Sequence, residues 1–291
     1  AKVFLITDRP YLGEDVCATQ RLWLESDAKP KTGLGQAIYG DSSGSNATGN
    51  GYRVVTPMDV KRTLDEALLR SKVDYLYGSY VTEVLHDPEG ELAGVVVANR
   101  SGRQAIRGNV IVDATERASV ARIAGAGFTP YPSGPQTFKR VVVGGKPNPK
   151  AKDLGFKYTV VETINKRRTA KKSYSVYEYD LEIPMNDGSW ASFVHADRIA
   201  RDQTYQAGQA TYSEKLFQIP PDHLRSRGAH DGSSDSVVNI PLAAMTPAGM
   251  KHIYVLGGCA DVSREVAAQL LTPLESLQLG QKVGEQIGGI A

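Results

Sequence analysis

Side chains suited to proton transfer are few in this sequence. The chain has five histidines among 291 residues, and His195 lies in the aromatic-rich stretch SFVHAD, where it could act as an acid–base group or as the partner of a hydride. His223 and His230 flank a segment in which Arg225 and Arg227 could bind an anionic substrate. The alternatives are a hydrogen-bonded core or surface histidine for His195 and a polar surface loop for the other four residues.

The two cysteines, Cys17 and Cys259, are too few and too far apart in sequence for a disulfide framework or a structural zinc site. Cys17 could be redox-active, but it has no C-x-x-C partner and so does not indicate a disulfide reductase. No group of histidine, cysteine and carboxylate residues has the spacing of metal ligands. We therefore expect no metal centre.

The charge balance argues against nucleic acid and membrane partners. Lys and Arg total 34 against 32 for Asp and Glu, a formal net charge of +2. The densest basic run, NKRRTAKK at 165–172, lacks the aromatic residues of a base-stacking platform. No stretch approaches the ~18 apolar residues of a membrane span, and no signal sequence is recognisable. These features predict a soluble protein of the cytoplasm or periplasm that acts on a small molecule.

The first apolar run, Val3–Ile6, predicts a buried strand that is closed by Thr7, Asp8 and Arg9. In a dinucleotide-binding unit, a strand that ends in a polar or acidic residue beside the cofactor ribose is the second strand of the sheet. It follows a first strand and a glycine-rich turn. This sequence has no room for either ahead of Val3.

The next elements predict a crossover that returns to the same sheet. Residues 33–53 are polar and glycine-rich and predict a loop, whereas Thr56 and Pro57 are typical of a helix start. Residues 73–115 predict an antiparallel meander that ends in a buried strand, Val110–Val112, and a helix follows directly. A strand, a helix, a meander and a returning strand are the order of an FAD-type Rossmann domain.

Residues 128–240 predict an inserted α+β substrate domain. The stretches YSVYEYDLEIP and SWASFVHA have the aromatic and β-branched content of strands, whereas DRIARDQTYQAGQATYSEKLF could be helical. The segment PYPSGP marks the domain boundary. The fold class predicted is therefore α/β, with an incomplete Rossmann-like domain over 1–127 and 241–291 and the substrate domain between them.

The C-terminal residues return to a Rossmann pattern. Residues 253–256 predict a strand, and the double glycine that follows gives a turn where backbone can approach a ligand. Thr272 and Glu275 predict a capping box, and the helix should run from Pro273 to residue 287. Gly280 and Gly284 lie one turn apart, which favours close packing.

Together, these blocks resemble the FAD-dependent oxidoreductases of the glutathione-reductase-like Rossmann type. The resemblance rests on KVFLITDRPYLGEDV, on VIVDATERASVARIAGAG, and on IPLAAM followed by MKHIYVLGGCADVSREVAAQLLTP and LGQKVG. It covers about 1–127 and 238–291. The middle of the chain resembles no family that can be named.

The resemblance implies FAD as the cofactor and assigns roles at the strand ends. Asp113 and its neighbours would border the pyrophosphate, and Asp261 would accept hydrogen bonds from the ribityl chain or from phosphate-bound water. The start of the last helix would face the flavin pyrimidine ring and stabilise the charge of reduced flavin. The cofactor-binding residues expected are Thr7, Asp8, Arg9, Val81, Asp113, Ala114, Thr115, Gly257, Gly258, Asp261, Thr272 and Pro273.

The chain departs from the family pattern at the phosphate site. The G-x-G-x-x-G turn is absent, and GLGQAIYG at 33–40 cannot replace it because no buried strand precedes it. Glu14 and Glu116 stand where glycines are usual, and a carboxylate beside pyrophosphate is repulsive unless Arg9 or Arg117 offsets it. These departures fit a flavoprotein that lacks its first ~30 residues, the length of the missing part of a βαβ unit, or one whose second chain supplies them.

The function expected is oxidation of a small organic substrate, held between the two domains, by hydride transfer to FAD, with His195 as the catalytic candidate. One alternative is a flavin-free scaffold or binding subunit that keeps the fold. Another is one piece of a split or truncated flavoprotein. An NAD-dependent dehydrogenase agrees less well, because a pure Rossmann domain has no meander before VIVDAT.

Overall fold

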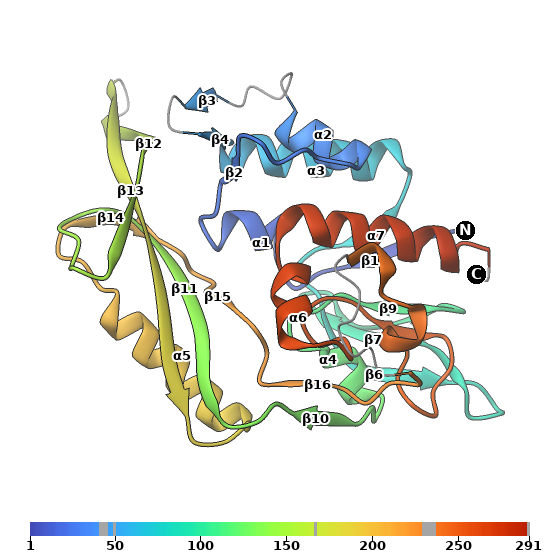
Figure 1. Cartoon of the computed structure of the whole chain (residues 1–291). Coiled ribbons are helices and arrows are strands. Elements are labelled where there is room, and N and C mark those ends of the chain that lie inside the picture. Colours follow the sequence, from blue (N-terminus) through green and yellow to red (C-terminus); the bar gives the residue numbers. More distant parts are fainter. Residues whose placement is uncertain (41–45, 49–50, 166–167, 229–236, 290–291) are drawn as a thin grey trace.

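An α/β body made from both ends of the chain lies beside a sheet made from its middle (Figure 1). The structure, a computed structural model, describes residues 1–40, 46–48, 51–165, 168–228 and 237–289. The α/β fold expected from the sequence is confirmed.

Two pairs of parallel strands form the base of the α/β body. Strand β1 (Phe4–Ile6) pairs with β5 (Asp74–Leu76), and β9 (Ile111–Asp113) pairs with β17 (Ile253–Val255). Three of these strands were predicted from the sequence and are present: β1 at the start of the chain, β9 before Ala114, and β17 before the double glycine. Each pair joins segments that are far apart in sequence, as a crossover topology requires.

Two of these strands are less buried than their apolar sequences predict. Phe4 of β1 is 40% exposed and Val112 of β9 is 41% exposed. Within the described part of the chain, β1 pairs only with β5, and β9 pairs only with β17. A parallel strand of this composition is normally paired on both sides and covered on both faces. Among the described residues, β1 and β9 therefore each keep one unpaired edge.

Helix α3 (Pro57–Arg70) makes the crossover between β1 and β5, where the sequence predicts it. The Thr56 hydroxyl accepts a hydrogen bond from the Asp59 N–H at 3.2 Å, which satisfies a donor of the first turn. The predicted meander follows as β6 (Tyr80–His86), β7 (Leu92–Asn99) and β8 (Gly102–Arg107). After β9, helix α4 (Ser119–Ile123) is shorter than the sequence suggests.

Residues 33–39 form a helix, so the predicted loop is wrong there. Helix α2 (Gly33–Tyr39) is capped by the Thr32 hydroxyl, which accepts from the Gly35 N–H at 3.0 Å, and its Ile38 and Tyr39 are buried. Burial of this apolar face outweighs the low helix propensity of glycine. The neighbouring elements are α1 (Glu14–Cys17), β2 (Trp23–Glu25), β3 (Asn46–Thr48) and β4 (Tyr52–Val54).

The middle of the chain forms an antiparallel sheet with one helix against it. The sheet contains β11 (Gly134–Gly144), β12 (Ala151–Asn165), β13 (Arg168–Met185), β14 (Gln209–Tyr212) and β15 (Phe217–Gln218). Helix α5 (Trp190–Gln203) packs on it through Phe193, Ala196 and Ala200. The predicted strand at SWASFVHA is therefore wrong: Ser189 caps a helix there, and three-to-four-residue spacing of apolar side chains covers the sheet.

The residues on either side of this sheet pack against the α/β body. Strand β10 (Phe128–Pro130) pairs with β16 (Asp222–Leu224). Ile219, Val237 and Ile240 join the core of α6 (Arg264–Leu270) and α7 (Pro273–Ile287), near η1 (Val237–Asn239) and η2 (Leu242–Met245). The middle sheet thus spans 134–218, within the predicted 128–240, whose boundaries stay a prediction.

Helix α7 has the predicted bounds but not the predicted capping box. The Thr272 hydroxyl donates to the Gln269 carbonyl at 2.8 Å and caps no N–H. Gly280 and Gly284 are exposed, and a Cβ built on either meets no atom within 4 Å, so the predicted close packing is absent from the described residues. The last helix therefore presents an open, small-residue face.

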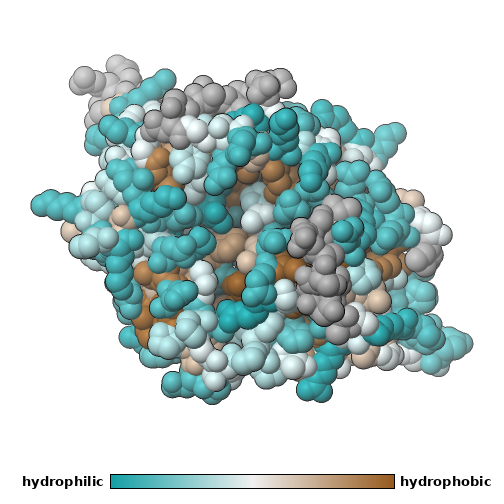
Figure 2. Space-filling model, viewed as in Figure 1, coloured by the Kyte–Doolittle hydropathy of each residue, from teal (hydrophilic) through white to brown (hydrophobic). Residues whose placement is uncertain are grey.

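No helix in the part of the chain that the structure describes is both long and apolar enough to cross a bilayer. On the face shown in Figure 2, hydrophilic residues dominate and hydrophobic residues appear in hollows between them.

Candidate functional site

The residues that follow β1 and β9 line one polar pocket. Arg9 and Glu14 come after β1, and Glu116 and Arg117 come after β9. The opposite wall is built by α5 and by residues 214–218, and the cavity holds about 220 Å³. Ligands of open α/β sheets bind beyond the carboxyl ends of the strands. This crevice between the α/β body and the sheet is thus the candidate site.

Asp8 offers a free carboxylate at the end of β1. It is exposed, and no described residue forms a hydrogen bond or ion pair with it. The neighbouring Thr7 instead holds the turn: its hydroxyl accepts from the Arg9 N–H at 3.2 Å, and its carbonyl accepts from the Ser79 N–H at 3.0 Å. An unpartnered carboxylate at this position matches the hydrogen-bond donors of a ribose diol.

Asp113 organises the turn between β9 and α4. It is 1% exposed, and one oxygen accepts from the N–H and the hydroxyl of Thr115 at 3.0 and 2.7 Å. The other oxygen accepts from the Ala121 N–H at 2.8 Å. Three of the roughly four acceptor sites of this buried carboxylate are occupied by donors of this chain. Asp113 therefore serves mainly to shape the turn that contains Ala114 and Thr115.

A chain of ion pairs closes the pocket between the two halves of the molecule. Arg9 lies 2.6 Å from Glu14 and 2.8 Å from Glu214. These carboxylates raise the pKa of the Arg9 guanidinium above its ordinary value. Because Arg9 is already paired with Glu14 and Glu214, it does not present an unshared charge to pyrophosphate.

Lys215 makes the second set of bridges across the pocket. Its Nζ lies 2.7 Å from Asp15 and 3.7 Å from Glu116. Burial alone would lower the pKa of Lys215, but the nearby carboxylates hold it above its ordinary value. The predicted repulsion from Glu14 and Glu116 is thus offset by Arg9 and Lys215, and the pocket is close to neutral.

The turn after β17 contains the two glycines that were predicted to let backbone approach a ligand. Gly257 has φ +96°, and a Cβ built on it would meet no atom within 4 Å, so the turn both needs glycine and faces open space. Gly258 serves packing instead, because a Cβ there would lie 2.8 Å from Pro220. Of the two glycines, Gly257 is the one with open space beside it, and its contact with a cofactor stays a prediction.

Asp261 forms hydrogen bonds with His223 and Ser226, which no sequence pattern connects with it. One oxygen lies 3.0 Å from Nδ1 of His223, and the other accepts from the N–H and hydroxyl of Ser226 at 3.1 and 2.7 Å. A hydrogen bond from a ribityl chain would have to compete with these donors. No local pattern signals this contact, because His223 and Asp261 lie 38 positions apart.

Of the predicted site residues, Arg9 alone is among the described residues that line the polar pocket. His195 is exposed on α5, and Val81 packs beside Ile6 and Leu76 beneath β1. Thr272 and Pro273 begin α7, and Pro273 lines a different, apolar cavity. His230 falls outside the described residues. The catalytic role of His195 and the cofactor contacts of the others stay predictions.

Both cysteines are buried free thiols. Burial raises the pKa of Cys17 to about 11 and that of Cys259 to about 12. A thiol that stays protonated is a poor nucleophile. Neither sulfur therefore fits a redox-active role, and no group of three potential metal ligands occurs in the described ranges.

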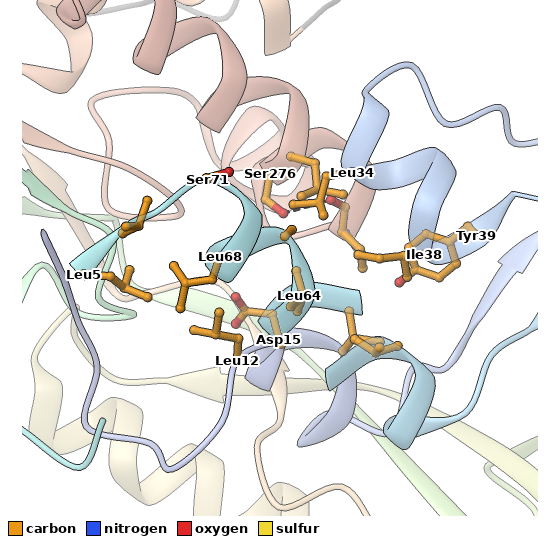
Figure 3. A pocket seen from close by; sticks show the side chains of 17 residues that line it. Leu5, Leu12, Asp15, Leu34, Ile38, Tyr39, Leu64, Leu68, Ser71 and Ser276 are labelled. Carbon is orange, nitrogen blue, oxygen red and sulfur yellow. Dashed lines mark hydrogen bonds between the residues drawn. The ribbon is translucent and has the colours of Figure 1, made fainter. Parts of the chain in front are cut away.

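A second cavity of about 430 Å³ runs along α3 and is lined mainly by apolar side chains (Figure 3). Leu64 and Leu68 of α3 face Leu5 of β1 across it, with Leu34 of α2 and Ser276 of α7 on another side. Leu5 places part of β1 in the lining of this groove. Its mainly apolar lining suits an apolar group rather than a charged one.

Two predicted residues have features that suit part of FAD, although neither lines the polar pocket. The exposed carboxylate of Asp8 suits a ribose diol, and the turn at Gly257 is open. The pyrophosphate needs a cluster of backbone N–H donors after a parallel strand. In the ranges that the structure describes, Gly33 and Gly35 lie in α2 instead, away from any parallel strand. The phosphate cradle is the part that these residues do not supply.

Comparison with known protein families gives one match. The family model of FAD dependent oxidoreductases matches residues 1–227. A search of curated proteins finds no match.

Solved structures align with this chain at low sequence identity and with TM-scores below 0.5. Anhydrotetracycline hydroxylase from Streptomyces rimosus aligns at 14% identity and TM-score 0.46, over 100% of this chain and 63% of its own. A geranylgeranyl bacteriochlorophyll reductase-like protein from Thermoplasma acidophilum aligns at 13% identity and TM-score 0.45, over 99% of this chain and 73% of its own. Aklavinone-11 hydroxylase, in a ternary complex with FAD and aklavinone, aligns at 9% identity and TM-score 0.48, over 98% of this chain and 58% of its own.

The chain spans less than two thirds of the length of the hydroxylases that it matches. The family model covers most of the 291 residues, including the strand ends that form the polar pocket. This chain belongs to the FAD dependent oxidoreductase family, whose cofactor is FAD.

Proposed function

We propose that this chain forms the larger part of an enzyme that oxidises a small organic substrate in the crevice between its α/β body and its middle sheet. FAD, when bound, supplies the acceptor for the hydride. The observation that carries the proposal is the convergence in one pocket of the residues that follow β1 and β9. A crevice at that edge is where an open α/β sheet holds its ligand.

The chain's own residues would bind and enclose the reactants. Asp8 would hold a ribose diol through its free carboxylate, and the open turn at Gly257 would allow close approach of backbone to the cofactor. The bridges from Arg9 to Glu214 and from Lys215 to Asp15 join the two walls of the crevice. They would limit the entry of water once the crevice is filled.

A second part of the proposal concerns the partner that completes the sheet. We propose a strand followed by a helix, joined to the chain ahead of Ala1, with the strand between β1 and β9 and the helix in the apolar groove. The unpaired edges of β1 and β9 and the exposure of Phe4 and Val112 support the strand. Such a strand would bring its following turn to the edge where a phosphate cradle is lacking.

The groove supports the helix. It follows one face of α3 from Val60 to Ser71, and its apolar lining would be buried by a helix with leucine- or alanine-rich contacts. On α7, Leu277 lines the groove, and Gly280 and Gly284 continue the same helical face with open space around them. Small residues at this spacing let another helix approach closely.

The test is the visible absorbance of flavin on the purified chain after incubation with excess FAD and gel filtration. It is measured on the 291-residue chain and on the chain extended by the sequence encoded upstream of it. We expect near one FAD per extended chain and far less on the shorter chain. A colourless extended chain that is folded by circular dichroism would reject the proposed function.

Hydrogen exchange tests the proposed strand and helix independently of FAD binding. With the extension, amides of β1 and β9 should exchange at least ~10-fold more slowly, because the new strand pairs their free edges. Unchanged exchange in both strands would reject the placement, even where FAD binds. Stoichiometric FAD on the shorter chain would also reject it, and a different co-purifying chain that protects the same amides would make a second chain the partner.

A further inference from the structure

Most of the charges that line the polar pocket neutralise one another. Arg9 and Lys215 each bridge to a carboxylate across the pocket, and Arg201 lies 2.7 Å from Asp197. Arg117 also lines the pocket, but among the described residues it pairs with no carboxylate. The pocket therefore has a positive charge that is available to a ligand.

The guanidinium group of Arg117 is positioned by an aromatic ring rather than by a counter-ion. It lies over the Trp190 ring at the start of α5, 4.7 Å from the ring centroid. A guanidinium above a ring can still donate through the N–H groups at its edge, and that edge matches the two oxygens of a carboxylate. We therefore expect Arg117 to bind an anionic ligand group through two hydrogen bonds.

Glu116 adds a carboxylate from the same turn to the pocket lining. Its side chain is 34% exposed, and the Nζ of Lys215, at 3.7 Å, lies beyond hydrogen-bond distance. Lys215 instead donates to Asp15 at 2.7 Å. Within the described ranges, no residue donates a hydrogen bond to the Glu116 carboxylate. Glu116 can thus accept hydrogen bonds from a cationic ligand group.

The side-chain amide of Gln218 lies in the pocket wall without a partner. Gln218 on β15 is 9% exposed, and its Oε1 is buried with no hydrogen bond. No described residue bonds to its amide nitrogen either, so a half-turn of the amide can direct the oxygen to where the nitrogen lies. Buried polar atoms in native proteins are nearly always hydrogen-bonded. An unsatisfied amide in the wall of a cavity therefore indicates a bound group that this chain does not supply.

Part of the pocket wall is apolar. Phe193 and Leu216 are each 2% exposed, whereas Val194 is 52% exposed. A cavity of about 220 Å³ has room for about seven water molecules at ~30 Å³ each, and so for a molecule with about that many non-hydrogen atoms. A short aliphatic side chain would be partly removed from water against this wall.

We propose that the polar pocket binds a small zwitterion, an α-amino acid with a short apolar side chain. Arg117 binds its carboxylate, and Glu116 and the amide oxygen of Gln218 bind its ammonium group. Its side chain lies against Val194 and Phe193. This inference deepens the proposed function, on which it rests, by naming the class of molecule that the crevice holds.

Other small ligands match these groups less well. A dicarboxylate would place its second negative charge beside Glu116, and a diamine would place a positive charge beside Arg117, where no opposite charge is free. An uncharged polyol would leave the charge of Arg117 without a counter-ion. A ligand that has one charge of each sign on neighbouring atoms uses both residues.

The first test is titration calorimetry of the 291-residue chain, without FAD, with L-alanine, L-proline and L-valine. We expect saturable binding of at least one of them, at one molecule per chain. The analogues of that amino acid without the ammonium group or without the carboxylate, isobutyrate and isobutylamine in the case of L-valine, should bind ~10-fold or more weakly. Absence of saturable binding to a chain that is folded by circular dichroism would overturn the proposal, as would equal affinity for the amino acid and either analogue.

Variants assign the two charges. Arg117→Gln should weaken binding of the amino acid ~10-fold or more and leave binding of the amine analogue unchanged, because the amine has no carboxylate. Glu116→Gln should weaken binding of both and leave that of the carboxylate analogue no weaker. Arg103→Gln and Glu83→Gln, from an exposed ion pair of the meander, are the matched controls and should bind like the wild type. Wild-type affinity in Arg117→Gln or Glu116→Gln would reject the role of that residue.

Gln218→Met removes the amide and keeps the length of the side chain. It should weaken binding of the amino acid but not that of the carboxylate analogue, since the amide oxygen binds the ammonium group. Unchanged binding of the amino acid would reject this contact and assign the unsatisfied amide to a water molecule.

The outcomes separate this inference from the proposed function. Failure of the extended chain to bind FAD rejects the proposed function, whereas titration of the shorter chain still decides whether the pocket binds an amino acid. An extended chain that binds FAD, together with a pocket that binds no amino acid, keeps the flavoprotein and overturns the zwitterion site.

Discussion

Replacing Asp113 by asparagine tests whether the turn after β9 depends on a charged acceptor. The wild-type carboxylate accepts three hydrogen bonds, from two donors of Thr115 and from the Ala121 N–H, in a site that is 1% exposed. The amide keeps one acceptor oxygen and replaces the other with an NH₂ donor. Whichever way it turns, a buried donor of this chain then faces another donor.

The expected loss follows from those contacts. A buried donor left without an acceptor costs about 1–3 kcal/mol, and the remaining bonds lose the assistance of the negative charge. We therefore expect Asp113→Asn to lower the free energy of unfolding by about 2–4 kcal/mol. Urea unfolding followed by circular dichroism measures this value, with an unchanged slope as the sign that compactness is unaltered.

The matched control is Asp180→Asn, an aspartate on β13 whose ion pair with Lys139 is exposed. Such a pair contributes about 0–1 kcal/mol, so this variant should stay close to the wild type. An Asp113→Asn protein within ~0.5 kcal/mol of the wild type would refute the role given to the turn, because surface substitutions away from such contacts stay in that range.

Three further predictions concern the packing of the N-terminal residues. Tyr158→Phe removes a hydroxyl that bridges backbone groups of residues 20–22 at 2.9 and 3.3 Å; urea unfolding should show a loss of about 1–3 kcal/mol, and no loss would place water there instead. Gly13→Ala, at φ +84° and with its methyl 2.8 Å from Leu64, should lower the melting temperature by several degrees, ~1 kcal/mol or more; an unchanged value would contradict the close approach. Burial raises the pKa of Cys17 from 9.0 to about 11, so its stabilising effect is complete below pH 9 and is lost as the pH rises to about 11; unfolding free energies at pH 8 and pH 10.5 should fall less with pH in Cys17→Ala, and parallel profiles would refute this.

Local signals in the sequence predict the elements whose causes are local. Thr56 and Pro57 start α3 as expected, because a side-chain cap and a fixed φ act within one turn. Helix α2 was not predictable in this way: Gly33 and Gly35 favour a loop, and burial of Tyr39 against distant residues decides the outcome. The same limit explains Thr272, whose hydroxyl finds the Gln269 carbonyl instead of an N–H.

In the candidate site too, features with local causes could be predicted from the sequence, whereas contacts between distant residues could not. Asp8 and Gly257 could be located from sequence because each lies two residues after an apolar strand. The ion pair between Arg9 and Glu214 could not, since the two residues lie 205 positions apart and meet only when the middle sheet docks. The contact of His223 with Asp261 depends in the same way on tertiary packing, so histidine spacing alone could not reveal it.

The division of the parallel strands into two pairs has a consequence for how the chain folds. β1 meets β5 about 70 residues later, and β9 meets β17 about 140 residues later, after the whole middle sheet has been synthesised. Closing such long loops costs entropy before any strand contact compensates for it, so both pairings should form late and slowly. The antiparallel meander and the β12–β13 hairpin join neighbouring segments and can form early. On the ribosome, β9 would therefore wait for its partner until nearly the entire chain has emerged.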